Sequence, residues 1–163
     1  MVWIVEVGYK DEVTDTVGFL IKKEIEELGI KGVEEVRSFN TYSITGEISE
    51  EELKRIGQEL LSDNQTQNFG LYGKVVNKTL SKMESPKGWL VEITFKKGVT
   101  DAVGMSTLNA IEILGMDNIT NVRTGEKYLI LGNIPEGIID KICRAVLVNP
   151  LIQDYSYHKI GGD

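Results

Sequence analysis

Hydrophobic and polar residues follow the same order twice along this chain. Apolar side chains alternate with polar ones over residues 3–9 and again over residues 89–95, which predicts two β-strands. Apolar residues at helical spacing follow each strand and predict a helix. In the first helix these residues are Val17, Leu20, Ile21, Ile25 and Leu28, and in the second Val103, Thr107, Ala110, Ile111 and Leu114. The same β-α unit is therefore predicted in both halves.

The repetition extends to identical residues. The segment Val13-Thr14-Asp15 recurs 86 residues later as Val99-Thr100-Asp101, and the glycine three positions on, Gly18, recurs as Gly104. About a third of the residues are identical when the chain is aligned to itself with this offset. The sequence therefore indicates a tandem duplication.

Each repeat continues with two short strands, a second helix and a last strand. The short strands are expected to form a hairpin that turns at Phe39-Asn40 in the first repeat and at Gly125-Glu126 in the second. In the first repeat Ser49 begins a capping box for the second helix, and in the second repeat Pro135 stands at the start of that helix. The short strands are predicted over residues 33–38, 41–46, 119–124 and 127–132, and the last strands over 69–75 and 151–158.

This β-α-β-β-α-β order predicts an α+β fold, in which each repeat is a ferredoxin-like unit with an antiparallel four-stranded sheet. The expected domains are residues 1–76, a linker over 77–88, and residues 89–163. Units of this size are only marginally stable alone, so we expect the two to pack together.

Charge and cysteine content narrow the classes of function. The net charge is −7 and there is no basic stripe, so we expect neither nucleic acid nor an anionic membrane as a partner. There is no apolar run of the length needed to cross a bilayer. A single cysteine, Cys143, cannot form an internal disulfide, and a cytoplasmic protein is expected.

The candidates for chemistry are few. The chain has one histidine, His158, and one cysteine, and neither has a partner nearby in sequence, so no catalytic, cofactor-binding or metal-binding residues are predicted. Asp15 and Asp101 could be general bases, but each stands where a helix begins, and helix capping is favoured. Gly29 and Gly115 are expected to end the two helices.

The residues that recur also resemble a known family. Residues 97–104, Val122 to Tyr128, and Asn149 to Tyr155 resemble PurS, the small subunit of phosphoribosylformylglycinamidine synthase. The resemblance implies that this chain is a pseudo-dimer, two PurS-like units joined covalently. It further implies a non-catalytic assembly subunit that bridges a glutaminase subunit and an ATP-dependent synthetase subunit in purine biosynthesis.

Eight residues are candidates for contact with those partners: Arg37, Tyr42, Arg123, Lys127, Leu129, Leu131, Asp154 and Tyr155. Leu129 and Leu131 alternate with apolar Tyr128 and Ile130, so both faces of their strand are apolar. We expect the Leu face to lie outside the helix-facing core and to be covered by a partner or by the first repeat. A homo-oligomer is also possible.

A second hypothesis comes from another class of protein. ACT-like regulatory domains share the β-α-β-β-α-β order and bind small molecules at the first β-α turn. A metabolite bound by the isolated chain would favour that function, whereas a synthase partner would favour the assembly role.

Overall fold

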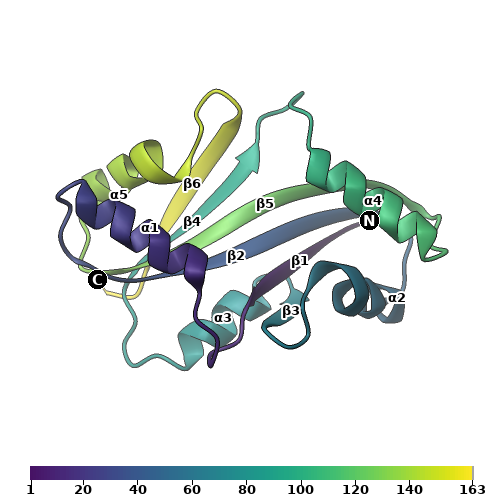
Figure 1. Ribbon diagram of the computed structural model, residues 1–163, viewed down its shortest axis with the longest axis horizontal. Coiled ribbons are helices and arrows are strands. Elements are labelled where there is room, and N and C mark those ends of the chain that lie inside the picture. The colour runs from purple at the N-terminus through teal and green to yellow at the C-terminus, as the bar shows by residue number, and fades with distance from the viewer. Residues whose placement is uncertain (163) are drawn as a thin grey trace. The chain divides into compact units, whose positions relative to one another are not determined.

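The computed structural model describes residues 1–162 as strands and helices that alternate along the chain (Figure 1). The strands are β1 (Val2–Tyr9), β2 (Val33–Gly46), β3 (Gln67–Leu71), β4 (Gly88–Phe95), β5 (Ile119–Gly132) and β6 (Gln153–Ile160). The helices are α1 (Thr16–Glu27), α2 (Glu50–Ile56), α3 (Lys74–Ser81), α4 (Ala102–Ile113) and α5 (Glu136–Ile142). Single π-helical turns, η1 (Gly57–Leu61) and η2 (Cys143–Leu147), extend α2 and α5.

The strands of residues 1–162 form one six-stranded sheet in the order β3-β1-β2-β5-β4-β6. β1 is antiparallel to β2 and β3, and β4 is antiparallel to β6. The expected ferredoxin-like units are present, but they share this sheet and do not have separate four-stranded sheets.

The two hairpins predicted within the repeats are not formed. β2 and β5 are each 14 residues long and pass straight through Phe39-Asn40 and Gly125-Glu126. They are neighbours in the sheet, so one edge of each strand pairs with the other repeat instead of folding back on itself, while β2 also pairs with β1 of its own repeat.

The chain folds into two compact units, and each contains segments of both repeats. The first unit contains Met1–Val13, Phe39–Thr79 and Thr100–Gly125, and the second contains Thr14–Ser38, Leu80–Val99 and the chain from Glu126 onward. Each unit therefore takes its first helix from the other repeat: α4 belongs to the first unit, and α1 to the second.

The core of each unit is built in the same mixed way. In the first unit, Val5, Val7 and Ile44 of one repeat pack with Ile111 and Val122 of the other. In the second unit, Ile25 and Val36 pack with Val91, Ile130 and Ile139. Within this second unit α1 contacts η2, and Figure 1 shows α1 beside α5.

Part of the segment expected to be a linker is helical. α3 covers Lys74–Ser81, and its Val75, Val76 and Thr79 are buried. β3 ends earlier than predicted because Tyr72 and Gly73 have positive φ angles of 47° and 82°, which an extended strand does not tolerate. Val75, Val76 and Thr79 recur at helical spacing, so the sequence did contain this signal.

Candidate functional site

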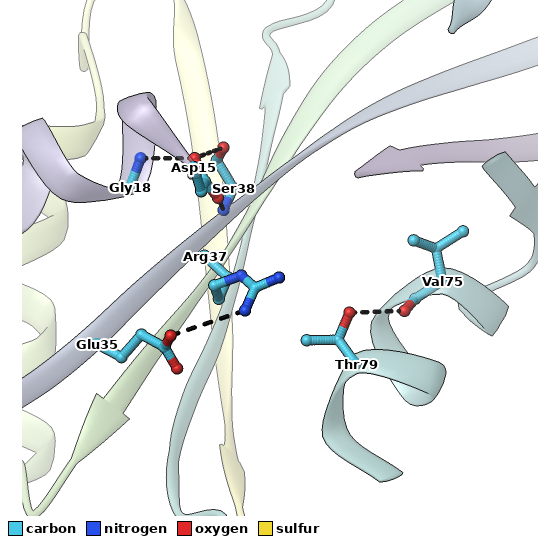
Figure 2. Close-up of polar contacts among 7 residues, drawn as sticks. All are labelled: Asp15, Gly18, Glu35, Arg37, Ser38, Val75 and Thr79. Atoms are coloured by element: carbon cyan, nitrogen blue, oxygen red, sulfur yellow. Dashed lines mark hydrogen bonds and ion pairs between the residues drawn. The ribbon is translucent and has the colours of Figure 1, made fainter. Parts of the chain in front are cut away.

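The turns between the first strand and the first helix of each repeat are closed by one aspartate each. The Asp15 carboxylate accepts hydrogen bonds from the Gly18 backbone N–H at 2.8 Å, the Ser38 backbone N–H at 2.6 Å and the Ser38 hydroxyl at 2.8 Å (Figure 2). Asp101 repeats the arrangement with Gly104 at 2.9 Å and the Thr124 N–H at 2.6 Å. Both carboxylates are buried and bonded within the protein, so they cap helices and hold them to strands.

The glycines of the same motif allow helix and strand to approach closely. A Cβ atom on Gly18 would lie 2.1 Å from the Val36 carbonyl oxygen, and one on Gly104 would lie 2.3 Å from that of Val122. A side chain at either position would therefore push the helix away from the strand. This close contact lies at the first β-α turn, where an ACT-like module would bind its ligand.

Two of the candidate cations pair with acids of the same repeat. Arg37 lies 3.7 Å from Glu35 on β2 (Figure 2), and Lys127 on β5 lies 3.7 Å from Glu92 on β4. Their side chains are only 15% and 14% exposed, so little of either is available to a partner. Arg123, the counterpart of Arg37, is half-buried on β5.

Polar and aromatic side chains of β6 and α5 form a cluster, and only some of its residues were predicted from the sequence. The Tyr155 hydroxyl donates to Asp140 on α5 at 2.7 Å, and Arg144 pairs with the same carboxylate. The hydrogen bond from Tyr155 is the main cause that lowers the pKa of Asp140, and the bond from Arg144 adds to it. The bond to Asp140 in turn raises the pKa of Tyr155. Asp154 remains 65% exposed while it pairs with Lys96 at 3.3 Å.

Asp140, Arg144 and Tyr157 belong to this group but were not among the predicted residues. Tyr157 stacks on Tyr155 at 6.3 Å between ring centroids and meets Trp89 edge-on at 5.5 Å. The spacing of Asp140 and Arg144, four residues apart on a helix, was a signal available in the sequence. Their pairing with Tyr155 depends on how α5 lies against β6 and had no sequence signal.

Tyr42, which was predicted as a contact, and its counterpart Tyr128, which was not, both lie inward. Tyr42 packs against the core of the first unit, and burial raises its pKa. Tyr128 belongs to the core of the second unit, where it donates a hydrogen bond to Glu126, and burial followed by that bond raises its pKa well above the usual range. These two residues contribute to packing.

Leu129 and Leu131, for which cover by a partner or by the first repeat was expected, are 0% and 6% exposed. They belong to neither of the two core clusters. They are already buried within the chain itself, so no separate protein is needed to cover them.

Exposed apolar side chains lie on the first helix of each repeat instead. Val17 and Leu20, two of the residues whose spacing predicted this helix, are 42% and 56% exposed, and Phe19 is 61% exposed. In the second repeat Val103 and Met105, the counterparts of Val17 and Phe19, are 59% and 60% exposed. The same two helical positions are thus apolar and exposed in both repeats, although neither was named as a contact.

The remaining groups offer no obvious chemistry. Cys143 is fully buried, and burial together with the charge of Asp140 raises its thiol pKa to about 12. Within residues 1–162, no three metal-ligating side chains lie together. Among the same residues, every helix is too short or too polar to span a membrane.

Comparison with known proteins identifies both repeats. Residues 3–71 and 89–160 each match the model of a family described as PurS, phosphoribosylformylglycinamidine (FGAM) synthase. The matched segments cover most of the chain.

Each individual relative matches a stretch of this chain about as long as one repeat. The chain is 33% identical over 73 residues to phosphoribosylformylglycinamidine synthase subunit PurS of Methanocaldococcus jannaschii, covering 40% of this chain and 84% of that protein. It is 35% identical over 71 residues to the Archaeoglobus fulgidus subunit of the same name, covering 40% and 89%. The crystal structure of the Methanocaldococcus jannaschii PurS matches 48% of this chain and 99% of its own, with 27% identity and a TM-score of 0.40.

Proposed function

Because this chain belongs to the PurS family, with one family unit in each of its repeats, we propose that it is a non-catalytic assembly subunit of phosphoribosylformylglycinamidine synthase. In this role it bridges the glutaminase subunit and the ATP-dependent synthetase subunit in the cytoplasm. The observation that carries the proposal is that two whole units match the family, not a fragment of one.

The structure supports an assembly role through what its motif residues do. Asp15, Asp101, Gly18 and Gly104 recur in both repeats, and all four serve to join a helix to a strand. The motif that the repeats share most clearly is therefore accounted for by folding. A scaffold that holds other subunits needs such rigidity and no reactive group of its own.

The exposed apolar positions on α1 and α4 are the surface that we assign to the partners. Phe19 and Met105 are each about three-fifths exposed, at equivalent places in the two repeats. Large apolar side chains exposed together mark surfaces for other proteins. With one such position in each unit, the chain can hold two different subunits at once.

The test is reconstitution with purified glutaminase and synthetase subunits. The full chain should bring both into one complex on gel filtration, and synthase activity with glutamine should require all three components. Phe19→Glu and Met105→Glu should each weaken complex formation, because each buries a charge at the contact. Lys54→Glu, at a polar exposed position on α2, is the matched control.

Two results would overturn this proposal. One is a complex of the other two subunits that forms and reacts equally well without this chain. The other is assembly that both apolar variants leave unchanged, which would place the contacts elsewhere.

A further inference from the structure

The strand β6 ends the sheet next to β4 and exposes one of its backbone edges. The Lys96 N–H donates to the Ile152 carbonyl at 2.8 Å, and the register continues through Thr94 opposite Asp154. In an antiparallel pair only alternate residues direct their backbone groups to the neighbouring strand. The backbone N–H and C=O groups of Asp154, Ser156 and His158 therefore point to β4. Those of Tyr155 and Tyr157 point to the open edge.

Of the features that usually prevent strands from pairing, this edge has charged side chains, Asp154 and Lys159, but neither a proline nor a short length. β6 is a regular strand of eight residues, with no proline between Gln153 and Ile160. The strand at the other end of the sheet, β3, has five residues and is followed by Tyr72 with a φ of 47°. A short edge strand of that kind is a poor template for another chain.

We propose that two copies of this chain pair edge to edge through β6, antiparallel, about a two-fold axis at Ser156. Residues directly opposite each other in an antiparallel pair lie on the same face of the sheet. This register places Asp154 opposite His158 of the second copy, and Tyr155 opposite Tyr157. The strand is complementary to itself in this one arrangement.

The side chains distinguish this register from its neighbours. Centring the pair on Tyr157 would put Asp154 opposite Ile160, and centring it on Tyr155 would put Asp154 opposite Ser156. Only the Ser156 register gives the carboxylate a hydrogen-bonding imidazole. Asp154 is 65% exposed even though it also pairs with Lys96 of its own chain, so it has room for a second partner.

The other face of the strand supports the same arrangement. Tyr155 and Tyr157 already stack within one chain, with ring centroids 6.3 Å apart. Pairing Tyr155 with Tyr157 of the second copy would set the two stacked pairs side by side, as a cluster of four rings. Aromatic cross-strand pairs are among the stabilising contacts of antiparallel sheets.

Sedimentation of the full chain by itself tests the proposal. Over a concentration series the 18.2 kDa chain should reach twice its mass and return to monomer on dilution, since an edge pair buries little area. Ser156→Lys places two ammonium groups against each other at the axis and should weaken the dimer about tenfold or more. Asn68→Lys, which adds the same charge to β3, should leave the dimer unchanged.

A charge exchange tests the register. Asp154→Lys and His158→Glu should each weaken the dimer, and the double variant should restore it because Lys again faces Glu. A chain that stays monomeric at all concentrations, a dimer broken by Asn68→Lys and not by Ser156→Lys, or a double variant as weak as the singles would overturn the proposal. The other synthase subunits are absent from this measurement, so its outcome is separate from that of the proposed assembly role.

Discussion

The carboxylate of Asp15 accepts a 2.6 Å hydrogen bond from the backbone N–H of Ser38, 23 residues further along the chain. The same carboxylate caps α1 through Gly18. One side chain thus fixes where the helix begins and which part of β2 it lies against. Asp101 and Thr124 form the same connection in the second repeat.

Removing this carboxylate should destabilise the fold without a change in secondary structure content. Asp15→Ala leaves the N–H groups of Gly18 and Ser38 without their acceptor, so we expect a loss of about 2–4 kcal/mol in the free energy of unfolding. Urea denaturation followed by circular dichroism measures it. Glu12→Ala, an exposed acid nearby, should change stability by less than about 0.5 kcal/mol. Equal losses in the two variants would contradict the capping role.

The glycines after the caps should tolerate no side chain. Gly18→Ala brings a methyl group to within 2.1 Å of the Val36 carbonyl oxygen, so helix and strand must separate, at a cost of about 3 kcal/mol or more. A Cβ atom on Gly137 of α5 would meet no atom within 4 Å, and Gly137→Ala should instead stabilise by about 0.5–1 kcal/mol. Opposite signs in thermal melts are the expected result.

The equivalent tryptophans should respond differently to loss of the indole N–H. Trp89 donates to the Ile134 carbonyl at 2.8 Å, whereas the buried Trp3 Nε1 has no hydrogen-bond partner within residues 1–162. We expect Trp89→Phe to cost about 1–2 kcal/mol more than Trp3→Phe, because only the former leaves a buried carbonyl unpaired. A difference in the other direction in denaturant titrations would show that the indole of Trp3 contributes a bond of its own.

The thiol of Cys143 should be inert in the folded protein. Burial raises its pKa to about 12 from an ordinary value of 9.0, so the folded state keeps the proton that the unfolded state loses. Its contribution to stability is therefore complete below about pH 9 and declines as the pH rises toward 12. Alkylation followed by mass spectrometry should proceed at the rate of unfolding, and Cys143→Ala should flatten the alkaline part of the stability curve. Rapid labelling of the native protein would show an accessible thiolate.

Cutting the chain between the repeats should not release two folded monomers. The core of each compact unit contains residues from both repeats, so neither fragment can complete a core alone. With a protease site placed at Ser85-Pro86, we expect the two fragments to co-purify and to unfold in one transition. Two separately folded fragments on gel filtration would contradict the exchange of first helices.

The sequence by itself determined the local features of this protein. The duplication is visible in residues such as Asp15 and Asp101, and their position before an apolar helix predicted the caps. Alternation in residues 3–9 and 89–95 predicted the strands, because the side-chain period of a strand is a property of the local backbone. The apolar residues on both faces around Leu129 likewise predicted burial on two sides.

Only the tertiary structure decided how the repeats share these elements. A hairpin at Gly125-Glu126 and a straight strand through it satisfy the same backbone groups, the first with the same repeat and the second with the other. In the structure β2 and β5, each 14 residues long, are neighbours in the sheet, so pairing between the repeats prevails over the local turn propensity. The exposure of Phe19 and Leu20 also depends on the exchange, since it places α1 on the core of the second unit. Such long-range pairings leave no period in the sequence, and so they appear only in the folded chain.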